Sequence, residues 1–255
     1  MKVANTLIIL FVLFITGCVS TSQIEETDLA NMQTSKVATN FFIANERIHY
    51  TETLYRVLWL ETKTSSMDLS GIWDSKTDIL NLVDESVSSL GINSLKISNT
   101  GTDDELLRDY VAGLNKDYDS NSIEIPETPE TKLQPSSSYF SKYPTYNEFE
   151  NLRISLLNNG VDFLFEYLSP EIYGNAIGYG IVQIIMPSQL RIIDLKNKKV
   201  IWNYSGIAVE QYQLGGDLKE LEKNNLAILK KGIRAGVTNV LSKDLHGPTF
   251  GVKEI

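Results

Sequence analysis

Residues 158–167 read Asn-Asn-Gly-Val-Asp-Phe-Leu-Phe-Glu-Tyr, and they decide the fold because a helix ends and a strand begins within them. Apolar residues at helical spacing precede the stretch: Phe149, Leu152 and Leu156. From Val161 onward the apolar residues alternate with others, which is typical of a strand. Since Gly160 ends the helix directly before that strand, we expect the two elements to pack against each other.

Upstream of this stretch the pattern predicts the order strand, helix, strand, helix. Residues 54–60 are apolar on both faces, as in a strand covered on two sides. An apolar stripe over about residues 77–90, ended by Gly91, predicts a helix, and residues 92–97 predict a short strand. A capping pair then opens a second helix over about residues 102–114.

Downstream, three strands and a long helix are expected. The strands cover about residues 177–186, 190–195 and 200–204, and their short connections predict antiparallel pairing. The helix runs over about residues 217–241 and carries a regular apolar stripe. Two glycines within it, Gly232 and Gly236, predict close approach of another backbone.

Composition divides the chain into a body and connecting segments. Residues 18–36 are polar and predict a flexible tether. Residues 37–250 hold the elements above, interrupted at 116–144 by a segment rich in proline and serine that predicts a long excursion. The fold class expected is a mixed α/β (α+β) domain, with a mixed sheet of about five or six strands flanked by helices and a long C-terminal helix.

The N-terminus resembles a bacterial lipoprotein signal. Lys2 precedes the apolar run Leu7–Ile15, which is too short to cross a bilayer, so residues 1–17 predict a cleaved signal peptide. The segment Ile15-Thr16-Gly17-Cys18 resembles a lipobox, and by that resemblance Cys18 carries lipid and begins the mature chain. The alternative is an ordinary secreted protein with a free thiol near its cleavage site.

The residues after the cysteine predict the compartment. Val19 and Ser20, with no Asp among them, resemble the pattern of lipoproteins sorted to the outer membrane of Gram-negative bacteria. Several acyl chains hold a protein far more firmly than one, since each buried methylene contributes about 0.8 kcal/mol. We therefore expect an outer-membrane lipoprotein, with palmitate among its acyl chains, whose domain faces the periplasm.

Charge and cysteine content exclude some classes of function. The net charge is −9, which opposes binding to nucleic acid and to anionic lipid head groups. Cys18 is the one cysteine of the sequence, so disulfides cannot stabilise the domain and a packed core must do so.

Part of the chain resembles a known group of lipoproteins. A helix that ends before Gly160-Val161-Asp162 and a strand, a hairpin with Asp194 before its turn and Trp202 after it, and a closing long helix are the features concerned. They resemble periplasmic α/β lipoproteins of the curli-secretion and penicillin-binding-protein activator type, over about residues 145–245. Val161 replaces the usual small alanine. The resemblance implies a binding or assembly role in the envelope without a small-molecule ligand.

Motifs for catalysis and for cofactors are missing from the sequence. His49 and His246 have no second metal ligand at useful spacing, and no Gly-x-Ser-x-Gly string occurs. The glycine-rich residues 174–180 lack the pattern of a phosphate-binding loop and predict a tight turn. We therefore predict no catalytic residue, no cofactor and no metal.

Acidic pairs remain the open question for an enzyme. Asp162 and Glu166 are expected on a solvated face of their strand and Asp194 in a turn, while Trp202 and Tyr204 are expected in the core. The leading hypothesis is a lipid-anchored module, not an enzyme, that binds an envelope protein or copies of itself. The alternative is an enzyme acting on envelope glycan or peptidoglycan, with two carboxylates meeting in a cleft.

Overall fold

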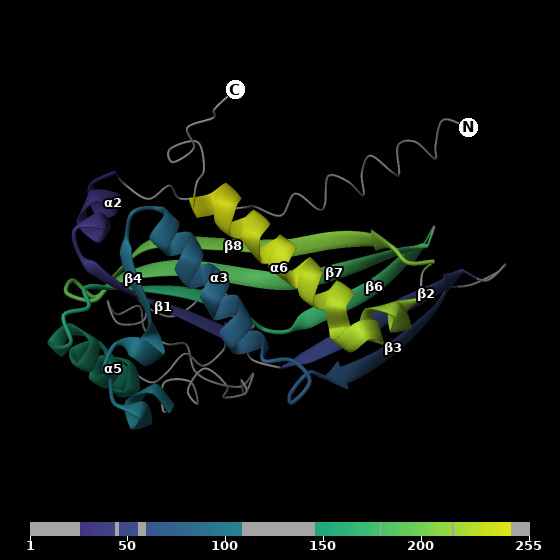
Figure 1. Cartoon of the computed structure of the whole chain (residues 1–255), viewed down its shortest axis with the longest axis horizontal. Coiled ribbons are helices and arrows are strands. Elements are labelled where there is room, and N and C mark those ends of the chain that lie inside the picture. The colour runs from purple at the N-terminus through teal and green to yellow at the C-terminus, as the bar shows by residue number, and fades with distance from the viewer. Residues whose placement is uncertain are drawn as a thin grey trace, which may run out of the picture.

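The computed structural model describes residues 26–43, 46–55, 60–108, 146–178, 180–215 and 217–245 (Figure 1). Its helices are α2 (Glu26–Gln33), α3 (Ser75–Ser89), α5 (Tyr146–Asn158) and α6 (Lys223–Leu245), with the short 3-10 helices η1 (Ile97–Asn99) and η3 (Leu218–Glu222). Its strands are β1 (Lys36–Ile43), β2 (Arg47–Tyr55), β3 (Leu60–Asp68), β4 (Asn93–Lys96), β5 (Phe163–Ser169), β6 (Ile172–Gly178), β7 (Ile181–Asp194) and β8 (Lys199–Gln213). The predicted mixed class, with helices flanking a mixed sheet, is confirmed.

Among the described residues the sheet holds eight strands, more than predicted, and three of its rows each consist of two shorter strands. β7 pairs along one edge with β8, and along the other edge with β6 and then β5. β1 lies parallel to β5, and β2 lies parallel to β6. β4 and β3 complete the sheet beside β1 and β2. The eight strands therefore form five rows. Sequence patterns underestimated the number of strands because they missed β1 and predicted parts of β2 and β3 as one strand.

The two strands predicted at residues 177–186 and 190–195 are not separate strands in the structure. Residues 181–194 form the single strand β7, and 172–178 form β6 before it. Pro187 lies within β7 and lacks an N–H to donate. The β6 ladder ends at Ile185 and the β5 ladder begins at Gln189, so Pro187 lies where neither strand needs that hydrogen bond. The proline therefore does not end the strand, as it would in an uninterrupted sheet.

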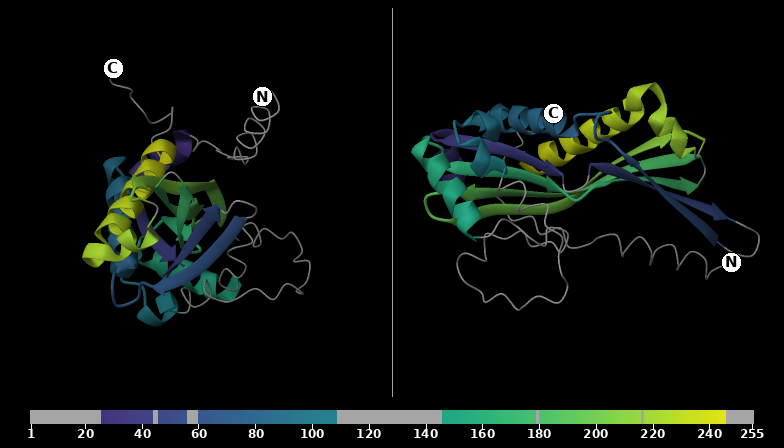
Figure 2. Two further views of the ribbon diagram at one scale, coloured as in Figure 1. Left: turned by 90° about the vertical axis from the view of Figure 1, so that its right-hand side faces the viewer. Right: turned by 90° about the horizontal axis from the view of Figure 1, so that it is seen from below.

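Helices cover both faces of the sheet, and each face has its own core (Figures 1 and 2). α3 and α6 pack on one face, where Phe163, Phe165 and Tyr167 of β5 lie among their apolar side chains. α5 packs on the other face against the alternate residues Leu164 and Leu168. Burial of both sets of β5 side chains explains why its sequence is apolar almost throughout.

α3 and α5 follow the prediction closely. Ile79, Val83 and Val87 of α3 are fully buried, and the Asp74 side chain caps the helix by accepting a hydrogen bond from the Thr77 N–H. Gly91 and Gly160 both have positive φ, as expected of residues that end helices. After α5 the Val161 N–H donates to the Leu156 carbonyl, which turns the chain directly into β5.

The prediction for the start of the domain was wrong in two places. Residues 26–33 of the predicted tether form α2, whose Met32 side chain is buried, and β1 begins at Lys36. The single strand expected at 54–60 is instead the end of β2 and the start of β3, with residues 56–59 outside the described ranges. β1 mixes polar Thr39 and Asn40 with apolar residues, which hid a central strand from pattern analysis.

The C-terminal helix is long but does not start as predicted. Residues 218–222 form η3, and the backbone from Asn224 to Leu226 has positive φ before the regular part of α6. Gly236 confirms the predicted close approach of another backbone, whereas the neighbours of Gly232 are the side chains of Ile184 and Tyr212. A Cβ on Gly236 would lie 3.2 Å from the Ala208 side chain and 3.4 Å from the Val209 nitrogen of β8.

Several predicted segments lie outside the described residues: the signal peptide over residues 1–17, the excursion at 116–144, and His246. Residues 104–108 are helical, at the start of the helix expected over 102–114, and residues 109–114 of that prediction are also outside. No described helix is long and apolar enough to cross a membrane.

An ion-pair cluster fixes α5 to the turn between β7 and β8. Glu150 accepts hydrogen bonds from Arg153 at 2.6 and 2.8 Å and pairs with Lys198 at 3.0 Å. Arg153 also donates to the Leu195 carbonyl at 2.6 Å. The Arg153 hydrogen bonds, followed by those of Lys198, lower the pKa of Glu150 from 4.5 to about 2.

We expect Glu150→Gln to lower the free energy of unfolding by about 1–2 kcal/mol at pH 7, after allowance for solvent screening. Because the folded-state pKa is lowered, this stability is complete above pH 4.5 and is lost as the pH falls toward 2. Urea unfolding at a series of pH values measures it. Glu220→Gln, which breaks an exposed ion pair with Lys223, is the control and should cost less than about 0.5 kcal/mol. A Glu150→Gln deficit that is the same at pH 3 and pH 7 would contradict this account.

Candidate functional site

Cys18, the one predicted site residue, lies outside the described residues. Its acylation therefore stays a prediction. Seven residues, 19–25, lie between the predicted anchor and α2, the first described element. The functional surfaces below belong to the domain itself.

His49 lies close to the acidic side chain of Glu171. His49 lies within β2, not before a strand as expected, and its Nε2 is 2.7 Å from a Glu171 carboxylate oxygen. Glu171 also accepts a hydrogen bond from the Tyr173 hydroxyl. Among the described residues, no group of three or more His, Cys, Asp and Glu side chains is arranged to hold a metal ion.

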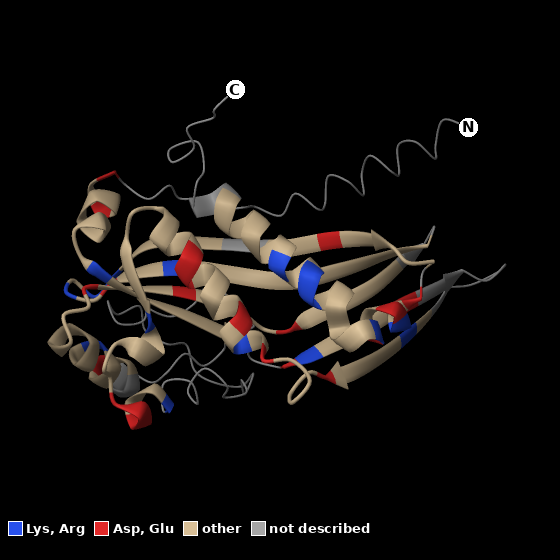
Figure 3. Cartoon of the chain, viewed as in Figure 1, with Lys and Arg blue, Asp and Glu red and all other residues tan. Residues whose placement is uncertain are grey.

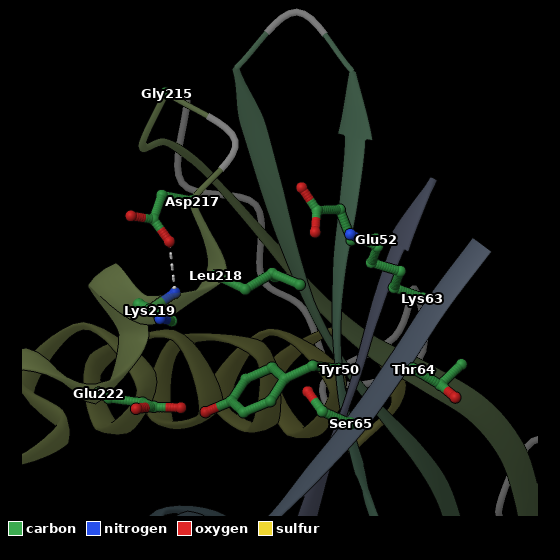
Figure 4. A pocket seen from close by; sticks show the side chains of 10 residues that line it. All are labelled: Tyr50, Glu52, Lys63, Thr64, Ser65, Gly215, Asp217, Leu218, Lys219 and Glu222. Atoms are coloured by element: carbon green, nitrogen blue, oxygen red, sulfur yellow. Dashed lines mark hydrogen bonds between the residues drawn. The ribbon is translucent and has the colours of Figure 1, made fainter. Parts of the chain in front are cut away.

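A polar hollow of about 500 Å³ lies between the β2–β3 hairpin and the segment that holds η3 (Figure 4). β2 and β3 supply one wall and residues 215–222 the other. Its lining residues are Tyr50, Glu52, Lys63, Thr64, Ser65, Gly215, Asp217, Leu218, Lys219 and Glu222. On the wall formed by the two strands, Glu52 lies opposite Lys63, and Tyr50 lies opposite Ser65.

The hollow combines a phenol with charges of both signs. Tyr50 is buried, and its hydroxyl points toward Glu222 in Figure 4. Burial, and then the neighbouring Glu222 carboxylate, raise the pKa of the Tyr50 phenol, so it stays protonated. Asp217 is held by a hydrogen bond from the Lys219 N–H at 2.9 Å. The arrangement can bind a small polar group, but its lining does not select one ligand class.

A buried polar row crosses the sheet on the face that carries α5. Asn40, Glu166, Arg191 and Asn203 stand side by side on β1, β5, β7 and β8. Arg191 Nε is 2.5 Å from a Glu166 carboxylate oxygen, with the two side chains 1% and 0% exposed. Burial raises the pKa of Glu166, while Arg191 and Asn40 oppose the shift. Gln189 extends the row through a 3.2 Å hydrogen bond to Asn203.

The expectation of a solvated Glu166 was therefore wrong. The alternation of β5 correctly places Glu166 opposite the phenylalanines. It does not show that this opposite face is also covered. Asp162 and Asp194 behave as predicted: Asp162 pairs with exposed Lys196 at 2.7 Å, and Asp194 accepts hydrogen bonds from Asn197 in the turn.

The row also bears on the hypothesis of a carboxylate enzyme. That hypothesis calls for two acids in one cleft, one of them with a raised pKa. The pKa of Glu166 is raised, but this carboxyl is enclosed in the sheet and paired with Arg191. The acids that do share a hollow are Glu52, Asp217 and Glu222 (Figure 4).

A third surface is apolar and lies beyond the end of this row, on β7 and β8. Ile207 is 58% and Val209 36% exposed, and both lie on the sheet face that points away from α6. Their cross-strand partners Pro187 and Ile185 are half-buried. Trp202 and Tyr204, on the opposite face of β8, are buried in the core as predicted. The sequence did not reveal the apolar surface, because β8 was expected to end at residue 204.

Comparisons with known proteins give distant structural similarity only. No family model matches the sequence, and no curated protein matches it. Protein XCC0632 from Xanthomonas campestris, of family DUF330, aligns with a TM-score of 0.39 and 6% identity over 81% of each chain. Protein CT253 from Chlamydia trachomatis aligns with a TM-score of 0.39 and 13% identity, over 82% of this chain and 97% of that one.

The LpoB C-terminal domain from Salmonella enterica also aligns, with a TM-score of 0.26 and 8% identity, over 70% of this chain and 90% of that domain. These scores are too low to assign the chain to a family.

The buried Glu166–Arg191 pair allows a test of how much this ion pair contributes to the stability of the domain. Arg191→Met should lower the free energy of unfolding by about 3–5 kcal/mol, because it leaves a buried carboxylate without its cation. Glu166→Leu combined with Arg191→Met should recover most of that loss, since both charges are then removed. Denaturant unfolding of the two variants measures the difference.

A double variant as unstable as Arg191→Met would show that the pair itself is required. Arg191→Lys serves as a second comparison. It keeps the charge but loses the guanidinium geometry, and should fall between the wild type and Arg191→Met.

Proposed function

We propose that this chain is a lipid-anchored periplasmic protein of the outer membrane that binds another protein of the cell envelope. The lipobox-like segment 15–18, with its single cysteine after a short apolar run, carries the proposal. It supports a location at the membrane surface, where a folded domain can meet membrane-bound or periplasmic proteins.

Features of the domain support binding rather than chemistry. In the described, cysteine-free part of the domain, Glu166 is buried within the sheet and paired with Arg191, and burial raises its pKa. The exposed apolar residues Ile207 and Val209 lie together on one strand, and clustered exposed apolar surface is typical of protein interfaces. The net charge of −9 disfavours nucleic acid as the partner.

The anchor is tested at Cys18. We expect the N-terminal peptide of the protein extracted from membranes to start at Cys18 and to carry acyl chains, measured by mass spectrometry and by incorporation of labelled palmitate. Cys18→Ser should abolish the label and block normal maturation. A conservative change directly after the segment, Val19→Ala, should leave both unchanged. A Cys18→Ser protein that matures normally and stays with membranes would contradict the anchor.

Protein binding is tested in the same cells. Affinity purification of the wild-type chain from detergent-solubilised envelopes should return one or more envelope proteins in repeated experiments. The matched control is a chain with Ile207→Lys, which places a charge in the exposed apolar surface. The proposal fails if the wild type returns no reproducible partner and is also a monomer.

Enzymatic activity on glycan or peptidoglycan remains the alternative, and the acids of the hollow in Figure 4 are where it would be sought. Glu52→Gln, Asp217→Asn and Glu222→Gln remove its carboxylates one at a time. Digestion of purified peptidoglycan by the wild type but not by one of these variants would favour the enzyme over the binding module.

A further inference from the structure

The free edge of β8 differs from the other edges of the sheet. β8 is fifteen residues long, and in the described part of the chain β7 is the strand that pairs with it. Along its outer side β8 therefore presents a row of backbone N–H and C=O groups. Such a row is complementary to another β-strand, and folded proteins normally protect it.

The other edge strands show this protection. β4 is only four residues long. β3 carries a run of exposed polar side chains: Thr62, Lys63, Thr64, Ser65 and Ser66. Short length and lysine on an edge are both recognised means of preventing strand addition.

β8 lacks these features over most of its length. Residues 202–213 contain no Pro, Lys or Arg, and Glu210 is the single charged residue among them (Figure 3). The Glu210 carboxylate accepts a 2.8 Å hydrogen bond from Asn239 of α6. The register shift at Ile192 and Ile193 is the one irregularity in the β7–β8 ladder, and it lies near the start of β8. The edge is thus long, regular and nearly uncharged.

We propose that the β8 edge pairs, antiparallel and about a two-fold axis at Ile207, with the β8 edge of a second copy of this chain. This deepens the proposed function, because it rests on the lipid anchor to bring copies together. It would join two sheets into one continuous sheet with α3 and α6 of both copies on the same side.

Charge and apolar surface favour a second copy as the occupant. With the axis at Ile207, residues 201–213 of one copy lie opposite residues 213–201 of the other. The two Glu210 residues then stand about 20 Å apart along the strands, well beyond the screening length in physiological salt. Ile207 faces its own counterpart, and Val209 lies opposite residue 205. The exposed side chains of Ile207 and Val209 would then form one apolar surface across the axis, continuous with Ile185 and Pro187.

Anchoring in one leaflet makes such pairing effective. Lipid-held copies share a thin layer, which raises their effective concentration, so an interface of modest affinity is sufficient. An antiparallel overlap of this length supplies about a dozen backbone hydrogen bonds.

Disulfide trapping in cell envelopes tests the register, because the sequence has no cysteine other than Cys18. Opposed residues of antiparallel strands have Cα atoms about 4.5–5.5 Å apart, within disulfide range. The full-length Ile207→Cys chain should form a covalent dimer on mild oxidation. Val209→Cys alone should not, because its two copies would lie more than about 13 Å apart. Differently tagged Ser205→Cys and Val209→Cys chains, expressed together, should form a mixed dimer.

Ile154→Cys, on α5 and 44% exposed, is the matched control and should stay monomeric, as should the wild type. Equal trapping at residues 154 and 207, a monomeric Ile207→Cys chain, or its capture on a different protein would each overturn the proposal.

A second measurement does not depend on cysteine. For the full mature chain in detergent, Ile207→Lys should raise the dimer dissociation constant at least tenfold in sedimentation experiments, since two lysines would face each other at the axis. Ile154→Lys is the control, and thermal unfolding of both variants verifies folding. No change on Ile207→Lys in a folded protein would refute the pairing. The mass of the N-terminal peptide, determined on the same samples, separates the two hypotheses. An acylated monomer would contradict the pairing but not the anchor. An unacylated dimer would contradict the anchor but not the pairing.

Discussion

The whole sheet depends on β7, because both of its edges are occupied along nearly their full length. β8 follows one edge for fourteen residue positions, while β6 and β5 share the other. Each of those two strands in turn pairs with one strand from the first part of the chain, β2 or β1. Elements from residues 36 to 213 are therefore aligned by one strand, and the helices pack on the sheet that this alignment forms.

Local patterns predicted the elements whose two ends are marked in the sequence. α3 has an apolar stripe of Ile79, Val83 and Val87 and ends before a glycine, and Gly160 separates α5 from β5. These signals depend on neighbouring residues alone, so the sequence is sufficient to predict these elements. The same holds for Gly236, whose small size predicted its close approach to β8.

Other features depend on residues far apart in the chain, and these escaped prediction. β1 was missed because Thr39 and Asn40 look polar, yet both are buried beside partners from β4, β5 and α3. Glu166 looked solvated because its cation, Arg191, lies twenty-five residues away on β7. The hollow of Figure 4 joins residues 50–65 to residues 215–222, and no local signal links these segments. The predicted site residue, Cys18, belongs to a local sequence motif that lies outside the described residues, so its acylation stays a prediction.

The interruptions between β1 and β2 and between β5 and β6 lie side by side, because β1 pairs with β5 and β2 with β6. The sheet is thus two half-sheets that meet along a transverse seam, and Figure 2 shows β2 and β3 turned away from the half that carries α5. Among the described strands, β7 and β8 run unbroken across the seam. The β7–β8 hairpin and the core beneath α3 and α6 therefore together join the half that carries β1 and β5 to the half that carries the polar hollow.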